Sequence, residues 1–284
     1  MRWKLVALSL ESADSMAMMT SVSELLRRYQ QLFTLAPNWA YQLNPSIPFV
    51  GKNYSTSTPR IAVYASAENL THYERGDAIP SFFQGDGTWN RHRLAHESGR
   101  IRFFPYVHIA PVENGSLLCA VLYLLQKHLR GPLPSTPDDL LECLVVANVG
   151  KFSITTGGGK NRDYAGEPRR LADSLPYFRA DLEVLRPTLL IVPRTIYKQS
   201  AVRRLIDEVL PDTKVVPIPQ FNAKVVNIHL ARHASRAATL AQQLQGSAIA
   251  SWTDQLTGYA PGHPYRFYVT LDDVIASSRD KLLS

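Results

Sequence analysis

The most constraining feature of this sequence is a set of short apolar stretches that each end in polar residues. One of them, LVVANVGK at 144–151, predicts a buried strand of four residues that ends in a polar turn at Asn148. Similar stretches begin at Arg60 and at Thr213 and also break in polar residues. Short apolar runs bounded by turn signals are typical of parallel strands that are covered on both faces. The chain therefore favours an α/β fold.

Helical patterns alternate with these stretches between residues 60 and 246. We predict a central four-stranded parallel sheet flanked by helices on both faces, in one domain at 60–284 that follows an N-terminal helical extension and loop at 1–59. The fourth strand is TLLIVP at 188–193, and the tail is expected to add a strand at 266–270 and a helix from Leu271. The segments expected to form the main helices are 21–36, 115–131, 171–187, 196–211 and 229–246.

The polar residues that follow the predicted strands indicate a binding site. In an open parallel sheet, ligands bind just beyond the carboxyl ends of the strands. Three of the predicted strands would bring their polar ends to one edge of the sheet. The residues expected there are Glu68, Asn69, Asn148, Gln220 and Asn222.

Charge and composition limit the class of partner. The chain has 31 Lys and Arg against 24 Asp and Glu, a formal net charge of +7, which favours an anionic partner such as nucleic acid. Cys119 and Cys143 lie in apolar runs and are expected to be buried thiols, too few to form a zinc site. We expect no metal and no cofactor.

The N-terminal sequence and the apolar runs bear on location. The first apolar stretch stops at Glu11 without a cleavage site, and no apolar run approaches the about 18 residues of a membrane span. We therefore expect a cytoplasmic protein, a monomer with no membrane contact.

Four segments within roughly residues 60–235 resemble motifs of the uracil-DNA glycosylase superfamily. RIAVYASAENL at 60–70 is similar to the first strand and water-activating loop, and LVVANVGKFS at 144–153 to the strand with the base-reading Asn. DLEVLRPTLLIVPRT at 181–195 is similar to the helix, strand and turn that follow. KVVPIPQFNAK at 214–224 falls where members carry the strand that leads into His-Pro-Ser.

The chain also departs from the family pattern at three places. The first loop lacks the Gly and Pro of the family, and Pro193 replaces the usual Gly of the third turn. Gln220, Phe221 and Asn222 stand in the place of His-Pro-Ser. These departures favour a base other than uracil, such as a damaged base or a hypermodified phage base.

The resemblance implies a monofunctional DNA glycosylase. Such an enzyme hydrolyses the N-glycosidic bond of a flipped-out base and leaves an abasic site, here in DNA repair or anti-phage defence. The first loop has no Lys for Schiff-base lyase chemistry. Two alternatives remain open: a catalytically inactive nucleic-acid-binding sensor on the same fold, and a small-molecule nucleoside hydrolase.

Five polar residues have expected roles in this chemistry, each with a structural alternative. Glu68, the only acid of the first loop, is expected to activate water together with Asn69; the alternatives are an exposed first-turn residue and a helix cap. Asn148 is expected to read the base edge or else to close a turn. Asn222 and Gln220 are expected beside the departing base or in a turn.

Aromatic and basic residues complete the expected site. Tyr64, Phe82 and Phe83 are expected to stack on the base, the alternative being a position in the core. Loop cations are expected to contact phosphates, the alternative being a solvated charged face. The residues expected to bind DNA are Arg91, Arg93, Arg100, Arg102, Lys160, Arg162 and His229.

Overall fold

The computed structural model of this protein describes residues 21–32, 48–67, 115–128, 142–151, 155–156, 160–161, 168–219, 221, 223–256 and 258–277. Backbone contacts divide the chain into two compact units that interleave in sequence. The first unit comprises residues 1–95 and 142–215, and the second comprises residues 96–141 and 216–284. These boundaries differ from the extension at 1–59 and the domain at 60–284 that the sequence predicted.

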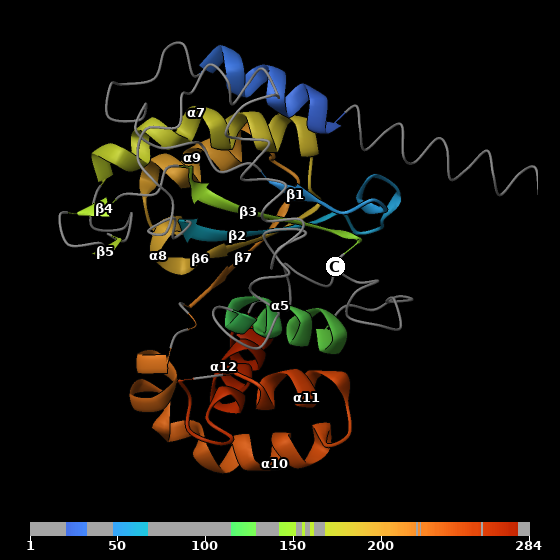
Figure 1. Ribbon diagram of the computed structural model, residues 1–284, viewed down its shortest axis with the longest axis vertical. Coiled ribbons are helices and arrows are strands. Elements are labelled where there is room, and N and C mark those ends of the chain that lie inside the picture. The colour runs from blue at the N-terminus through green and yellow to red at the C-terminus, as the bar shows by residue number, and fades with distance from the viewer. Residues whose placement is uncertain are drawn as a thin grey trace, which may run out of the picture. The chain divides into compact units, whose positions relative to one another are not determined.

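A five-stranded sheet organises the first unit (Figure 1). Along the sheet, the strands follow the order β1 (Phe49–Val50), β3 (Leu144–Gly150), β2 (Ile61–Ala67), β6 (Leu189–Pro193) and β7 (Lys214–Ile218). β2 is parallel to both β3 and β6, whereas β1 is antiparallel to β3. The α/β class is confirmed, and the prediction of four parallel strands is corrected to a mixed sheet of five. The short β1 escaped prediction because it consists of two residues.

Both faces of this sheet are buried. Alternate residues such as Tyr64, Val145 and Leu190 pack in one core with residues of the helices, and the intervening residues, such as Val63 and Leu144, are also buried. Burial on both sides explains why the strands are continuous apolar runs rather than alternating ones.

Helices of the first unit cover one face of the sheet (Figure 1). They are the helix at 21–32, α7 (Pro168–Leu185) and α9 (Ser200–Val209), and the short α8 (Arg194–Tyr197) follows β6. These elements confirm the helices predicted at 21–36, 171–187 and 196–211, although the last is divided between α8 and α9. A turn of η2 (Tyr54–Thr56) and a two-stranded antiparallel sheet of β4 (Thr155–Thr156) and β5 (Lys160–Asn161) complete the unit.

Apart from Val216–Ile218, the carboxyl end of β7, the described part of the second unit is helical. Its elements are α5 (Gly115–His128), η5 (Val225–His229), η6 (Ala231–His233), α10 (Ala234–Leu244), α11 (Ala248–Asp254) and α12 (Pro264–Ser277). The strand expected at 266–270 is wrong, because these residues form the first half of α12. Phe267, Leu271 and Ile275 are all buried at a spacing of four, and this helical period extends through the segment.

Aromatic rings pack against one another in the core of the second unit. Phe221 packs on Phe267 with ring centroids 4.3 Å apart, and Tyr123 stacks on Tyr268 at 4.4 Å. The Tyr123 hydroxyl donates to the Asp272 carboxylate at 2.8 Å. These contacts join α5 and the segment after β7 to α12.

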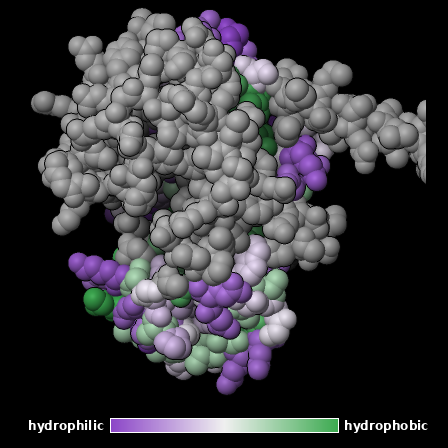
Figure 2. Space-filling view, viewed as in Figure 1, coloured by the Kyte–Doolittle hydropathy of each residue, from purple (hydrophilic) through white to green (hydrophobic). Residues whose placement is uncertain are grey.

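The surface, the cysteines and the helix lengths of the described residues complete the description of the fold. Figure 2 shows hydrophilic side chains over the described part of the second unit, interspersed with weakly hydrophobic ones. Cys119 is buried and Cys143 is half-buried, and both are free thiols. None of the described helices has the length and apolarity that a membrane crossing requires.

Candidate functional site at the carboxyl ends of the parallel strands

Asn148 is a fully buried polar residue inside β3. The polar turn expected at this residue is wrong, because β3 continues to Gly150, and Asn148 pairs with Ala65 of β2. Side chains alternate between the faces of a strand. Val145, Ala147 and Val149 belong to the core on the helix-covered face, so Asn148 projects from the opposite face.

The strand order places Asn148 near the point where the chain reverses its direction across the sheet. The chain passes from β2 to β3 on one side of β2, and then returns to β6 on the other side. In open α/β sheets, ligands bind at such a switch point, beyond the carboxyl ends of the strands. Ala65 and Ser66, near the carboxyl end of β2, are half-buried, whereas the four residues before them are buried.

A second group of buried polar residues lies on the helix-covered face of the same strands. We call Tyr29, Tyr64, Lys151 and Asp181 the polar hub. The Lys151 Nζ atom donates to Asp181 Oδ2 at 2.5 Å, and both side chains are 0% exposed. The Tyr29 hydroxyl donates to Asp181 Oδ1 at 2.8 Å, and the Tyr64 hydroxyl to Oδ2 at 3.3 Å.

Burial and the neighbouring charges shift the pKa values of the polar hub. Burial raises the pKa of the Asp181 carboxyl, while the nearby Lys151 ammonium acts in the opposite direction. Burial and then the Asp181 charge raise the pKa values of the Tyr29 and Tyr64 hydroxyls well above their ordinary range, so both hydroxyls stay protonated and donate. The Lys151 ammonium also lies 5.5 Å from the centre of the Tyr64 ring and 5.8 Å from that of Tyr29.

Tyr64 is therefore a core residue in this structure. Its side chain is 0% exposed, and its ring meets Phe178 edge-on at 4.9 Å. This is the core position that the sequence analysis gave as the alternative to stacking on a base, and the buried ring offers no exposed face.

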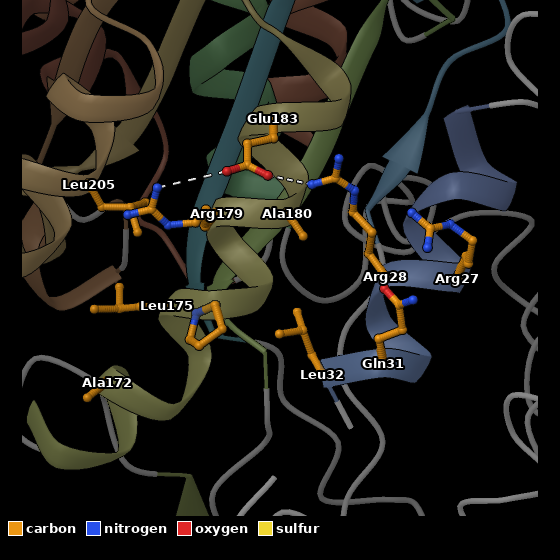
Figure 3. Close-up of a pocket in the computed structure, with 11 residues that line it drawn as sticks. Arg27, Arg28, Gln31, Leu32, Ala172, Leu175, Arg179, Ala180, Glu183 and Leu205 are labelled. Carbon is orange, nitrogen blue, oxygen red and sulfur yellow. Dashed lines mark hydrogen bonds and ion pairs between the residues drawn. The ribbon is translucent and has the colours of Figure 1, made fainter. Parts of the chain in front are cut away.

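A hollow of about 570 Å³ lies among the helix at 21–32, α7 and α9 (Figure 3). Its apolar lining includes Leu32, Leu175 and Leu205, and three guanidinium groups stand around it, those of Arg27, Arg28 and Arg179. Guanidinium groups around a hollow can bind an anionic ligand where they have no other partner.

The guanidinium groups of this hollow are already bonded to carboxylates. In Figure 3, Glu183 lies between Arg28 and Arg179 with dashed lines to both. Arg28 also bonds Glu24 at 2.8 Å. Six charged residues, which we call the outer network, balance in charge and link three helices by ion pairs. They are Glu24, Arg27, Arg28, Arg179, Glu183 and Glu208.

A basic, exposed segment follows β7 in the second unit. Lys224, His229 and Arg232 are exposed, and Ile228 between them is 62% exposed, the one large hydrophobic residue so exposed among those described. His233 is buried instead, and burial lowers the pKa of its imidazole. Asn227 anchors the segment, because its side chain bonds His263 Nδ1 at 2.9 Å and the Gly258 carbonyl at 3.3 Å.

Most of the residues that the sequence predicted for the site lie outside the described part of the chain. The structure places Asn148, Tyr64 and His229, and it places the backbone of Lys160 in β5. Asn148 and Tyr64 lie on adjacent strands but on opposite faces of the sheet, so the structure does not bring them together. The expected residues outside the described ranges are Glu68, Asn69, Phe82, Phe83, Arg91, Arg93, Arg100, Arg102, Arg162, Gln220 and Asn222.

Sequence reasoning missed the polar hub, although one signal for Asp181 was present. Tyr177, Phe178, Leu182 and Leu185 are apolar residues at helical spacing on α7, and Asp181 lies within their stripe. A carboxylate on the apolar face of a helix requires a buried partner. No comparable pattern indicated Lys151, whose partner is 30 residues away.

The described residues contain no cluster of His, Cys, Asp and Glu that could hold a metal ion. Comparison with protein-family models, with curated proteins and with solved structures finds no match to this chain.

Proposed function

We propose that this protein is a DNA glycosylase, which hydrolyses the N-glycosidic bond of a flipped-out damaged or modified base and leaves an abasic site. The observation that carries the proposal is Asn148, a fully buried amide near the carboxyl ends of parallel strands, in the strand next to β2, which borders the switch point between β2 and β6. A primary amide both donates and accepts hydrogen bonds, which suits the edge of a base.

The end of β2 supports the same proposal. Glu68 directly follows Ala67, the last residue of β2, and β2 is the strand that pairs with β3 beside Asn148. A carboxylate that follows this strand suits the activation of water for glycosidic hydrolysis. In this proposal Glu68 and Asn69 position the water, and Asn148 holds the base.

The charge of the chain and the segment after β7 support a DNA partner. The formal net charge is +7, and Lys224, His229 and Arg232 form an exposed basic stretch in the second unit. The Lys224 ammonium and the Arg232 guanidinium suit contacts with phosphates, which contribute affinity independent of sequence.

The direct test incubates the protein with DNAs that carry different modified bases and then measures abasic sites and released base. We expect excision from at least one DNA without added metal. In that assay Asn148→Ala should lose about 1–3 kcal/mol of transition-state stabilisation, because the base edge loses its hydrogen bonds in a dry site. Full activity in the Glu68→Ala and Asn69→Ala double variant would remove the assignment of the water-activating loop.

A salt titration separates this proposal from a small-molecule nucleoside hydrolase. If about four cations contact phosphates, the logarithm of the DNA affinity should fall with the logarithm of salt concentration with a slope of roughly −3 to −4. Replacing Lys160 and Arg162 should flatten the slope by about one to two units. Salt-insensitive affinity, or no affinity for DNA, favours the nucleoside hydrolase. Salt-dependent binding without excision from any DNA favours the inactive sensor.

A further inference from the structure

Lys151, the residue that follows β3, is tied to α7 at two points. Its backbone N–H donates to the Ser174 Oγ atom at 3.0 Å, and its side chain donates to Asp181 Oδ2 at 2.5 Å. Ser174 and Asp181 are seven residues apart, about two turns of an α-helix, so they lie on the same side of α7. Both bonds are buried.

The Asp181 carboxylate also accepts hydrogen bonds from two other elements. Tyr64 reaches it from β2, and Tyr29 reaches it from the helix at 21–32. One side chain therefore joins β2, the end of β3, the first helix and α7 within the first unit. Tyr64 of β2 pairs with Ala147 of β3, and Ala147 lies four residues before Lys151 in the chain.

Stability alone gives a weak reason for such a hub. Burying an ion pair costs desolvation free energy, and apolar residues of similar volume often give equal or greater stability in the same place. An ion pair with further hydrogen bonds fixes the relative positions of its groups, because charge-assisted bonds require defined distances and angles. The hub is therefore suited to fixing the position of the strands.

For Asn148, the important property of β3 is its register against β2. Side chains alternate along a strand, so a shift of one residue would move every side chain to the other face. In the observed register, Lys151 meets Asp181 on the helix-covered face, while Asn148 projects from the opposite face. A shift of one residue would break the ion pair and would turn Asn148 toward the helices.

We propose that the polar hub is a positioning device, in which Lys151 and Asp181 fix the carboxyl ends of β2 and β3 on α7 and so hold Asn148 in place at the site. The assignment of Asn148 to the site rests on the proposed function, whereas the fixing of the strand ends does not. Lys151 and Asp181 are positioning residues and have no contact with substrate in this proposal.

The test replaces the hub by an apolar one of similar shape. The variant carries Lys151→Met, Asp181→Leu, Tyr29→Phe and Tyr64→Phe, so that no hydroxyl is left without its acceptor. We expect cooperative unfolding at a temperature close to that of the parent. Amide hydrogen exchange at residues 148–151 should become about tenfold faster or more. Excision should fall by about a hundredfold, mainly in kcat.

A matched control alters the opposite side of the same helix. Arg179→Gln with Glu208→Gln removes an exposed ion pair of α7 and α9 and leaves the hub intact. We expect parent exchange rates at residues 148–151 and parent excision. If excision by this control is as slow as excision by the apolar-hub variant, the effect belongs to α7 in general and the proposal is overturned.

A second variant serves if the apolar hub does not fold. Ser174→Ala removes only the bond to the Lys151 backbone. It should speed exchange of the Lys151 amide and lower kcat by a smaller factor, with a modest fall in the unfolding temperature because the buried Lys151 N–H loses its acceptor. Parent exchange rates and parent excision in the folded variant would overturn the proposal.

The two readouts separate failure of this inference from failure of the proposed function. If the parent protein excises no base from any DNA, the proposed function fails, and amide exchange still decides whether the hub fixes the end of β3. If the parent excises a base and the apolar hub does so equally well with parent exchange rates, the positioning role fails and the proposed function stands.

Discussion

The two sides of α7 carry the same kinds of charged group in opposite surroundings. On the inner side, Asp181 pairs with Lys151, and both side chains are 0% exposed. On the outer side, Arg179 pairs with Glu208, and their side chains are 36% and 63% exposed. A buried ion pair is very costly to break singly, whereas an exposed one contributes little and is screened by salt. The position of a charge on this helix, more than its partner, therefore determines what its removal does.

The polar hub and the outer network also differ in geometry. The Asp181 carboxylate accepts from three separate elements at one point. The outer network is a chain of pairs that runs from Glu24 through Arg28, Glu183 and Arg179 to Glu208. A break in such a chain leaves a solvated charge, whereas a break in the hub leaves a buried one.

The largest effect is expected when one partner of the hub is removed. Lys151→Ala should lower the free energy of unfolding by about 3–5 kcal/mol, because the Asp181 carboxylate then stays buried without its cation. Urea unfolding followed by circular dichroism measures this loss. A loss below about 1 kcal/mol would mean that water or another cation replaces Lys151, and the contrast between the two sides of α7 would disappear.

A smaller effect is expected for the tyrosines of the hub. Tyr29→Phe should lower the free energy of unfolding by about 1.5–3 kcal/mol, the range for a hydrogen bond to a charged group. Tyr64→Phe should cost less, because its bond to Asp181 is 3.3 Å long against 2.8 Å for Tyr29. The same urea experiment ranks the two variants, and equal losses would show that these distances do not set the strength of the bonds.

The outer network should respond weakly and with salt dependence. Arg28→Gln removes the bonds to Glu24 and Glu183, which are about one-third exposed. The loss of stability should be smaller than that of Tyr29→Phe and should vanish in about 1 M salt, where exposed charges are screened. Parallel unfolding curves at low and high salt test this, with Lys151→Ala as the salt-insensitive control.

The smallest expected effect is the pH response of Glu24. Hydrogen bonds from Arg27 and Arg28 lower the pKa of this carboxyl from 4.5 to about 2. Because the pKa is lowered in the folded state, the ionised carboxylate stabilises the fold at pH values above 4.5. This contribution is lost as the pH falls from 4.5 toward 2. Comparing the pH profiles of unfolding for the parent and Glu24→Gln should show a difference that shrinks over this window. A constant difference would exclude the ionised carboxylate as its source.

Local patterns allowed most elements of the fold to be predicted. Apolar runs indicated β2, β3, β6 and β7, and helical spacing indicated α5, α7, α9 and α10. The misassigned segment at 266–270 contains Phe267, Tyr268 and Val269, residues that suit a strand by propensity alone. Packing of successive turns of α12 overrides that propensity. The two-residue β1 depends on a partner strand about 95 residues later, and local sequence contains no such information.

The candidate site could be predicted only in part, for a related reason. Asn148 was recognised because it interrupts an apolar run, but the end of its strand was placed too early. Local sequence marks a polar residue as a turn, whereas the pairing with Ala65 keeps it in the sheet. Lys151 and Asp181 come together only when α7 folds back over β3, so their contact follows from the topology and not from any motif.

The short strand β1 has a consequence for how copies of this protein meet. Phe49 and Val50 pair with Val146 and Val145, and Gly51 donates to the Leu144 carbonyl at 2.8 Å. They therefore occupy one backbone edge of β3 along residues 144–146, within an entirely buried strand. An uncovered edge of this kind is a template on which another chain can add a strand and begin to aggregate. Phe49 and Val50 thus protect this edge of β3 from pairing with a strand of another copy.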